Sequence, residues 1–156
     1  MKGYTSETIR NVALLGHGGC GKTTFLEAAL LATGVTNRMG RVEDGNTVSD
    51  YDKMEVERGY SINTSVVPIL WKENKINFID TPGYFDFVGE VNAALRAAEA
   101  AVIMVDAGSG IQVGTEAAWK ACERYKTPRF IVINKRDKDE FDFYKTFDEL
   151  KAKFGN

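Results

Sequence analysis

The chain has 156 residues, a length typical of one globular domain with a single core. Its formal net charge of −2 gives no overall basic field, so charge offers no reason to expect direct DNA binding. Two cysteines exclude a disulfide framework and fit a reducing cytoplasm, and no segment approaches the roughly 20 apolar residues of a membrane span, so we expect no membrane association.

A glycine-rich segment follows the first predicted strand. Residues 11–15 form a short apolar run typical of a buried strand, and residues 24–31 strongly favour a helix. Between them, residues 16–23 read GHGGCGKT. A strand, a glycine turn and a helix in this order indicate a phosphate-binding P-loop, whose backbone N–H groups surround phosphate oxygens. A glycine-rich turn that matches by chance is the alternative for this segment taken alone.

Each residue type in this loop suits a phosphate ligand. The glycines permit the tight curvature that points successive N–H groups inward. Lys22 can reach the β- and γ-phosphates as a mobile charge, and the hydroxyl of Thr23 can ligate Mg²⁺. A redox-sensitive thiol is one interpretation of Cys20, and packing of a small residue is the other. The expected nucleotide contacts in this segment are Gly16, His17, Gly18, Gly19, Cys20, Gly21, Lys22, Thr23 and Thr24.

The next segment, residues 35–59, is polar and punctuated by glycines. It is too long for an ordinary connection and is therefore a candidate functional loop. Residues 61–71 then read as an extended strand, and a turn at residues 73–74 leads into a second strand at residues 75–79. We expect an antiparallel hairpin whose first strand lies at a sheet edge, because Pro68 has no backbone N–H to donate to a neighbouring strand.

The second hairpin strand leads into the motif Asp80-Thr81-Pro82-Gly83. The strand would present the Asp80 carboxylate near the γ-phosphate, where it reaches Mg²⁺ through water. An N–H at Gly83 can contact the γ-phosphate, and a contact made only with the triphosphate is released on hydrolysis. A helix cap or simple turn is the alternative role for Asp80. The expected nucleotide contacts here are Asp80, Thr81, Pro82, Gly83 and Tyr84.

Helices and strands alternate through the rest of the chain. Residues 101–105 and 130–133 are short apolar runs suited to parallel strands. Apolar residues at helical spacing mark three helices, which carry Phe87, Val91, Leu95 and Ala98, then Ala118, Cys122 and Tyr125, and finally a stripe expected in the core, Phe143, Phe147, Leu150 and Phe154. The pattern predicts an α/β P-loop fold, with a mostly parallel sheet, helices on both faces, one antiparallel edge hairpin and a ligand at the carboxyl ends of the strands.

A third motif, Asn134-Lys135-Arg136-Asp137, follows the last predicted strand. The Asp137 carboxylate can accept two N–H groups of guanine, whereas adenine presents an acceptor at the matching ring nitrogen. Such a polar match discriminates by about 10⁴ to 10⁵, so GTP or GDP is the expected ligand together with Mg²⁺. Lys135 can pack its stem on the base, and Asn134 is expected to tie this loop to the phosphate loop. The motif is weak alone and strong after an apolar strand in a P-loop protein.

Two further segments resemble the translational GTPases of the elongation factor G type. Residues 41–50, RVEDGNTVSD, and 57–62, ERGYSI, are similar to the first switch of that family, and the similarity continues through residues 80–87, DTPGYFDF. It covers residues 10–137. The resemblance implies a cytoplasmic, ribosome-associated translation factor that binds and hydrolyses GTP with Mg²⁺, with Thr23, Ser61 and Asp80 at the metal and Lys22, Gly83 and Tyr84 at the reacting phosphate.

The chain departs from this family at several positions. The family's metal-binding switch threonine falls on Ser61, which keeps the hydroxyl. Its water-positioning histidine falls on Tyr84, whose phenol is a poor base at neutral pH. Gly19 stands where the family commonly has an aspartate. His17 matches the family and either supports the loop or performs acid–base chemistry. We therefore expect slow hydrolysis without ribosomes, and the alternatives are a GTP-dependent ribosome-binding switch with little hydrolysis and an interaction domain with an inactive pocket.

The sequence ends after the helix that follows Asp137, before the family's fifth guanine motif and last strand. We therefore expect residues 1–156 to be an N-terminal fragment of a GTP-binding domain, with a lower nucleotide affinity than the complete domain. The strand at residues 130–133 is then expected to leave an unpaired sheet edge.

Overall fold

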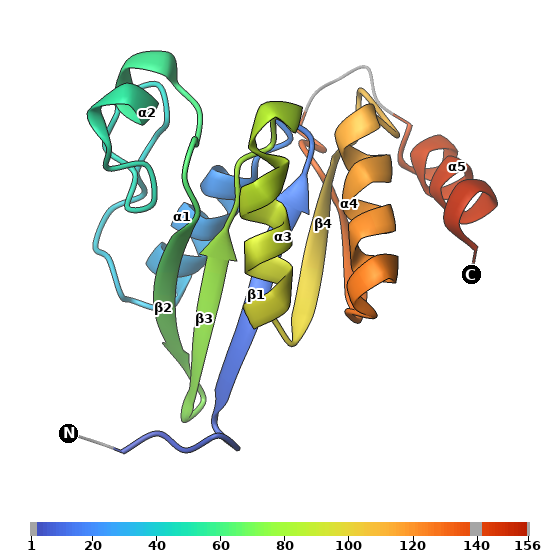
Figure 1. The fold of residues 1–156 in the computed structure, drawn as a ribbon. Helices are drawn as coiled ribbons and strands as arrows, with labels where there is room; N and C mark the ends of the chain where they lie inside the picture. Colours follow the sequence, from blue (N-terminus) through green and yellow to red (C-terminus); the bar gives the residue numbers. More distant parts are fainter. Residues whose placement is uncertain (1–2, 138–141, 156) are drawn as a thin grey trace.

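A five-stranded sheet forms the centre of the structure, a computed structural model that describes residues 3–137 and 142–155 (Figure 1). The strand order is β2-β3-β1-β4-β5. The β2–β3 pair is antiparallel, and the other three pairs are parallel. The strands are Ile9–Gly16 (β1), Ser65–Trp71 (β2), Asn74–Asp80 (β3), Ala100–Asp106 (β4) and Arg129–Asn134 (β5). This confirms the predicted mostly parallel sheet with one edge hairpin.

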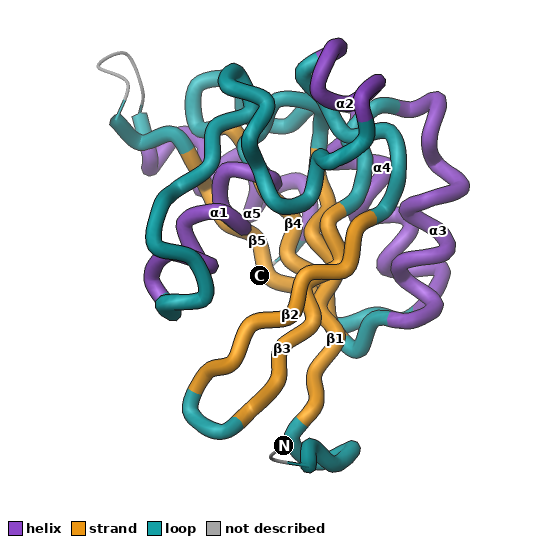
Figure 2. Tube along the Cα trace, turned by 90° about the vertical axis from the view of Figure 1, so that its left-hand side faces the viewer, coloured by secondary structure: helices purple, strands orange, loops and turns teal. Residues whose placement is uncertain are grey.

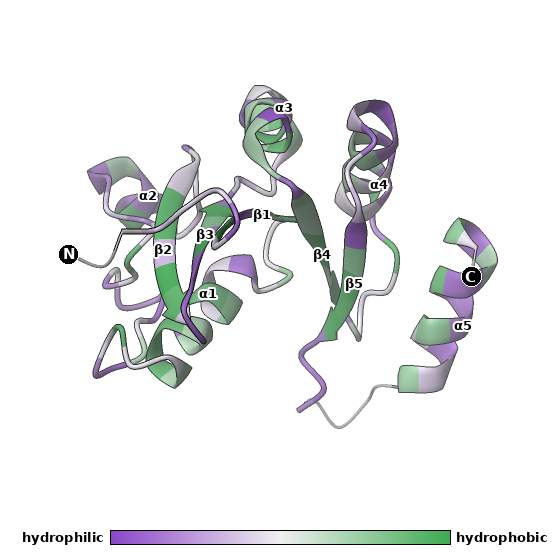
Figure 3. Cartoon of the chain, turned by 90° about the horizontal axis from the view of Figure 1, so that it is seen from below, coloured by the Kyte–Doolittle hydropathy of each residue, from purple (hydrophilic) through white to green (hydrophobic). Residues whose placement is uncertain are grey.

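Helices cover both faces of this sheet, as predicted. In the view from below, α1 lies on one face and α3 and α4 lie on the other, while α5 extends beyond β5 (Figure 3). The helices are Lys22–Ala32 (α1), Lys53–Arg58 (α2), Val88–Ala97 (α3), Val113–Tyr125 (α4) and Phe143–Phe154 (α5), and a 3₁₀ turn (η1) spans Phe85–Phe87. No helix in the described part of the chain combines the length and apolar character that a bilayer crossing needs.

Each face of the sheet has its own core because neighbouring side chains of a strand point to opposite sides. Leu14 of β1 packs with Leu26 and Leu30 of α1, and all three are buried. Its neighbours Ala13 and Leu15 belong to the core under α3 and α4. Burial on both faces explains why the central strands read as continuous apolar runs.

The structure corrects several expected boundaries. The first hairpin strand begins at Ser65 rather than at residue 61, because the N–H groups of residues 62–64 bond to glutamate side chains instead of the strand ladder. Ala98 follows α3 in an extended conformation, so it is not part of the predicted helical face. Phe147 is 47% exposed and does not join the core, although Leu150 of the same helix does.

A short helix, α2, was not predicted within the long loop of residues 35–59. Asp52 and Glu55 form a capping box at its start, and Gly59 ends it in the left-handed conformation. Helix α2 and the surrounding loops gather at one end of the sheet (Figure 2). These loops therefore stand over the carboxyl ends of the parallel strands.

The two sheet edges lie where the sequence predicts them. Pro68 is in β2, at one edge. β5 forms the other edge of the sheet within the described residues, and its Phe130 is 68% exposed. Between these edges, β1, β3 and β5 end at Gly16, Asp80 and Asn134, so the three motifs meet at one end of the sheet.

Candidate nucleotide site

The phosphate loop curls between the end of β1 and the start of α1. Gly21 precedes α1, and within the described residues no side chain caps this helix N-terminus. Lys22 is 6% exposed, and its ammonium donates to the carbonyl oxygens of Gly16 and His17 at 3.2 and 3.1 Å. The loop thus presents free helix N–H groups and one fixed positive charge, a combination that attracts phosphate.

The three residues expected at the metal lie together. The Thr23 hydroxyl donates to Asp80 Oδ2 at 3.0 Å and lies 3.5 Å from the Ser61 hydroxyl. Two residues that the sequence analysis did not select complete the cluster. Ser49 donates to the same Asp80 oxygen at 2.9 Å, and Ser61 donates to Asp50 Oδ1 at 2.6 Å. The sequence signal for Ser49 and Asp50 was their place in the switch-like segment 41–50, to which no individual role was assigned.

The cluster contains two buried carboxylate oxygens, Asp50 Oδ2 and Asp80 Oδ1, that have no hydrogen-bond partner among the described residues. Burial raises the pKa of Asp80 to about 6, against the opposing effects of Lys22 and of two hydroxyls. Burial also raises the pKa of Asp50. Two carboxylates, each with one oxygen that accepts no hydrogen bond from the described residues, lie beside two hydroxyls. This group of oxygens fits a hard divalent cation, because oxygen is the ligand that Mg²⁺ prefers. The described residues contain no metal-binding group built from three or more His, Cys, Asp or Glu side chains.

The segment after β3 lies against the phosphate loop. Thr81 is fully buried, and its hydroxyl donates to the Leu14 carbonyl at 2.6 Å, which fastens this segment to β1. Pro82 is also buried. Gly83 is so close to the loop that a Cβ there would overlap the Lys22 ammonium and the backbone of Gly18. A glycine is therefore required where the two segments meet.

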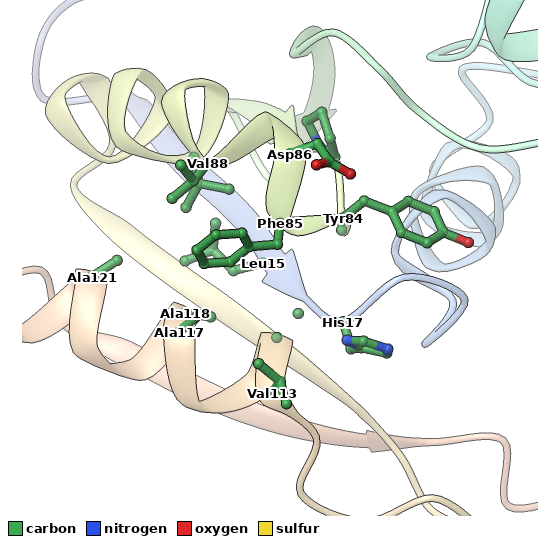
Figure 4. Close-up of a pocket in the computed structure, with 15 residues that line it drawn as sticks. Leu15, His17, Tyr84, Phe85, Asp86, Val88, Val113, Ala117, Ala118 and Ala121 are labelled. Atoms are coloured by element: carbon green, nitrogen blue, oxygen red, sulfur yellow. The ribbon is translucent and has the colours of Figure 1, made fainter.

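Two cavities adjoin this junction. The first, of about 230 Å³, is the phosphate cavity, and the predicted site residues lining it include Gly18, Gly19, Gly21, Lys22, Thr23 and Thr24 from the loop. Ser61, Gly83, Tyr84 and Lys135 close its other sides. The second, of about 260 Å³, is apolar and lies between η1, α3 and the start of α4 (Figure 4). Tyr84 points away from the apolar cavity, whereas Phe85 points into its mouth (Figure 4).

The loop after β5 is bonded to the phosphate loop. Asn134 donates its amide to the Cys20 carbonyl at 3.0 Å, which is the expected tie between the two loops. Lys135 donates to the Gly19 carbonyl at 2.6 Å and pairs with Asp106 at 2.9 Å. Asp137 is exposed at the end of this turn. The structure therefore brings the second and third motifs to the first, with Asp137 farther along the same loop.

Cys20 and His17 contribute mainly through packing and backbone. Cys20 is 1% exposed, and burial raises the pKa of its thiol, which favours the packing interpretation over a reactive thiolate. His17 offers its carbonyl to Lys22 and packs against Gly114 at the start of α4. These contacts favour the role of His17 as a support for the loop.

Three glutamates that the sequence analysis did not select hold the segment between α1 and β2 in place. The buried Glu27 of α1 accepts from the N–H groups of Gly40 and Val48 at 2.8 and 2.6 Å. Glu55 accepts from residues 62 and 63, both at 2.9 Å, and Glu90 accepts from residue 64 at 2.8 Å. Their local sequence gives no signal for this role, because the N–H groups that they accept from lie 7 to 26 residues away along the sequence, in irregular loops.

The comparisons with known proteins identify the family of the chain. Residues 7–156 match the elongation factor Tu GTP binding domain family. Elongation factor G of Granulibacter bethesdensis is 46% identical over 147 residues, which are 94% of this chain and 21% of that protein. The mitochondrial ribosome-releasing factor 2 of Drosophila melanogaster is 40% identical over 152 residues, which are 97% of this chain and 20% of that protein.

A solved structure shows the same fold. The crystal structure of a protein from Thermus thermophilus matches with a TM-score of 0.91 at 44% identity, over 95% of this chain and 22% of that one. The chain thus spans about a fifth of the length of the relatives it matches. Because the family match covers nearly all of its residues, the chain belongs to the elongation factor Tu GTP-binding domain family, as a translational GTPase domain that resembles elongation factor G.

Proposed function

We propose that the chain binds GTP with Mg²⁺ and hydrolyses it as part of a cytoplasmic translation factor that works on the ribosome. The observation that carries this proposal is that Lys22 and Thr23 of the first motif line one small cavity, and that the Thr23 hydroxyl donates to the buried Asp80 carboxylate of the second motif. Charge of both signs in that arrangement suits a metal-bound phosphate and little else.

Each part of the site has a role in this proposal. The loop N–H groups and Lys22 bind the β- and γ-phosphates, and Gly83 offers an N–H to the γ-phosphate. Thr23, Ser61 and Asp80 would hold Mg²⁺, which when bound neutralises charge on the phosphate oxygens. Asp137 accepts from the guanine edge, and the stem of Lys135 packs beside the base. The nucleotide contacts are those expected from the three motifs.

Tyr84 decides between hydrolysis and a switch without turnover. Its ring lines the phosphate cavity and the residue is 44% exposed, which supports a role for Tyr84 beside an attacking water. A neutral phenol is a weaker general base than an imidazole. Catalysis in this site would then rest on positioning and electrostatics, and a partner such as the ribosome would supply the remaining acceleration. The second candidate function is a GTP-dependent ribosome-binding switch with little or no hydrolysis.

Phosphate release from GTP tests the proposal, measured with and without ribosomes on the longest natural protein that contains this chain. Slow release that ribosomes accelerate supports the enzyme. GTP binding without stimulated release favours the switch, and rapid release without ribosomes contradicts the need for a partner. The variant Lys22→Ala is the control, since it removes the fixed charge from the phosphate loop and should abolish release in every condition.

A further inference from the structure

Two aromatic rings meet beside the phosphate cavity. The ring centroids of Tyr60 and Tyr84 are 4.6 Å apart at an interplanar angle of 57°. Both residues line that cavity. Tyr60 directly precedes Ser61 of the metal cluster, and Tyr84 directly follows Gly83 of the second motif. The ring pair therefore connects the two segments that face each other across the site.

Gly18 provides the space that the Tyr84 ring occupies. A Cβ added at Gly18 would lie 3.0–3.2 Å from three Tyr84 ring atoms, Cζ, Cε2 and Cε1. Gly18 is not among the glycines with a positive φ, so its backbone would accept a side chain. The ring, rather than the backbone, accounts for the glycine at this position.

Neighbouring contacts fix the Tyr60 side of the pair. Arg58 donates to the Tyr60 hydroxyl at 3.1 Å, and Ser61 donates to Asp50 at 2.6 Å. Tyr60 is half-buried, while Tyr84 is 44% exposed and follows a glycine. Tyr60 is thus the better anchored ring, and Tyr84 is the one that it can hold in place.

We propose that Tyr60 is a positioning residue, which holds Tyr84 over Gly18 and so keeps Gly83 against the Lys22 end of the cavity. This inference rests on the proposed function, because that end is where the γ-phosphate is expected. The two rings act as a cover that slows the escape of a nucleoside triphosphate. The energy of an aromatic pair corresponds to an acceleration of about threefold to tenfold when the contact is lost.

Dissociation of a fluorescent, non-hydrolysable GTP analogue and of fluorescent GDP tests the proposal by stopped flow. Tyr60→Ala and Tyr84→Ala should each speed release of the GTP analogue by about threefold to tenfold, and GDP release by less than twofold. The double variant should release the analogue no faster than the faster single variant, because both changes remove one contact. Tyr60→Phe keeps the ring but loses the Arg58 contact that anchors it, so it should speed release of the analogue less than Tyr60→Ala does.

Glycine substitutions provide a second, independent test. Gly18→Ala places a methyl group under the Tyr84 ring and should reproduce the effect of Tyr84→Ala on release of the GTP analogue. Gly89→Ala is the matched control, since a Cβ at Gly89 meets no atom within 4 Å and should leave release unchanged. Circular dichroism melts identify any variant that fails to fold, and Tyr60→Leu, which keeps apolar volume without a ring, then replaces Tyr60→Ala.

Three outcomes overturn the proposal: unchanged release from Tyr60→Ala, multiplied effects in the double variant, or equal acceleration of GTP-analogue and GDP release. Each of them presupposes that the wild-type chain binds guanine nucleotide. A wild-type chain that binds none overturns the proposed function itself, so the two failures are distinguishable.

Discussion

Asp80 is 1% exposed, and its carboxylate is surrounded by groups of both signs. Thr23 and Ser49 donate to one oxygen, Lys22 attracts the charge, and the nearby Asp50 repels it. Burial outweighs the favourable contacts and raises the pKa of Asp80 to about 6. A cation bound beside this acid would reverse that balance, so the same residue opposes folding without metal and favours metal binding.

We predict that Asp80→Asn stabilises the chain near neutral pH in the absence of nucleotide and Mg²⁺. Because the pKa of Asp80 is 3.8 in the unfolded reference and about 6 in the fold, the folded chain binds the proton more tightly, and stability falls as pH rises from about 4 through 6. At about 1.4 kcal/mol per pKa unit, ionisation of Asp80 lowers the free energy of unfolding of the wild-type chain at pH 7.5 by about 3 kcal/mol. Urea unfolding at pH 4.5 and 7.5 measures it.

The Asp80→Asn variant should exceed the wild type by about 1 kcal/mol at pH 4.5, where the unfolded acid is already mostly ionised, and by about 3 kcal/mol at pH 7.5. Addition of Mg²⁺ with GTP at pH 7.5 should reverse that order. Asp86→Asn is the control, because it removes an exposed carboxylate from the same segment. An equal difference between wild type and Asp80→Asn at both pH values would contradict the assignment of the effect to this proton.

At the scale of elements, the segment between α1 and β2 depends on side chains from outside it. Glu27 comes from α1 and Glu90 from α3, and each accepts backbone N–H groups of the segment. Buried N–H groups in an irregular loop need such partners, because they have no ladder or helix to pair with. The loop is therefore ordered by long-range carboxylates rather than by its own propensities.

We predict that Glu27→Gln loosens residues 40–48 without unfolding the sheet. The amide keeps one acceptor but places an NH₂ group where a backbone N–H now donates, which leaves a buried donor unpaired and costs about 1–3 kcal/mol. Hydrogen exchange of the peptide that contains Gly40 and Val48 should accelerate, while exchange in β1 stays slow. Glu57→Gln is the matched control, since Glu57 is exposed, and equal exchange in both variants would show that Glu27 does not hold the loop.

Helix α5 is fastened to the rest of the chain by an aromatic stack. The ring centroids of Phe154 and Trp119 lie 4.4 Å apart at an interplanar angle of 22°. The guanidinium of Arg129, the first residue of β5, lies 3.8 Å from the centroid of the Trp119 ring. Phe154→Ala should lower the free energy of unfolding by about 2 kcal/mol, less than a fully buried phenylalanine, because the ring is half-buried. Phe147→Ala, at a 47% exposed position of the same helix, should cost much less in the same denaturation experiment. Equal losses would mean that the stack does not anchor α5.

At the scale of the whole molecule, local sequence was sufficient for some features and not for others. The mostly parallel sheet with its edge hairpin and the meeting of the three motifs could be predicted, because apolar runs identify the strands and parallel strands end on one side. The tie from Asn134 to the phosphate loop could also be predicted. Asp50, Glu27 and the packing of Tyr84 over Gly18 could not, because each depends on contacts between segments that no local pattern encodes.

Guanine recognition should be measurable as stability of the entire fold, because a ligand that binds only the folded state raises its free energy of unfolding. At about 100 times the dissociation constant, GTP with Mg²⁺ should stabilise the wild-type chain by about 2.7 kcal/mol. ATP at the same concentration should give almost no shift in melting temperature, because adenine leaves the Asp137 carboxylate unpaired.

Asp137→Asn supplies the comparison, since the amide keeps the shape of the acid but cannot accept both guanine N–H groups. The variant should melt at the wild-type temperature without nucleotide, because Asp137 is exposed, and should lose most of the GTP shift. Lys22→Ala should lose the shifts with either nucleotide, which separates base recognition from phosphate binding. If ATP stabilises the wild type as much as GTP does, the phosphate loop alone governs binding and the turn after β5 does not select the base.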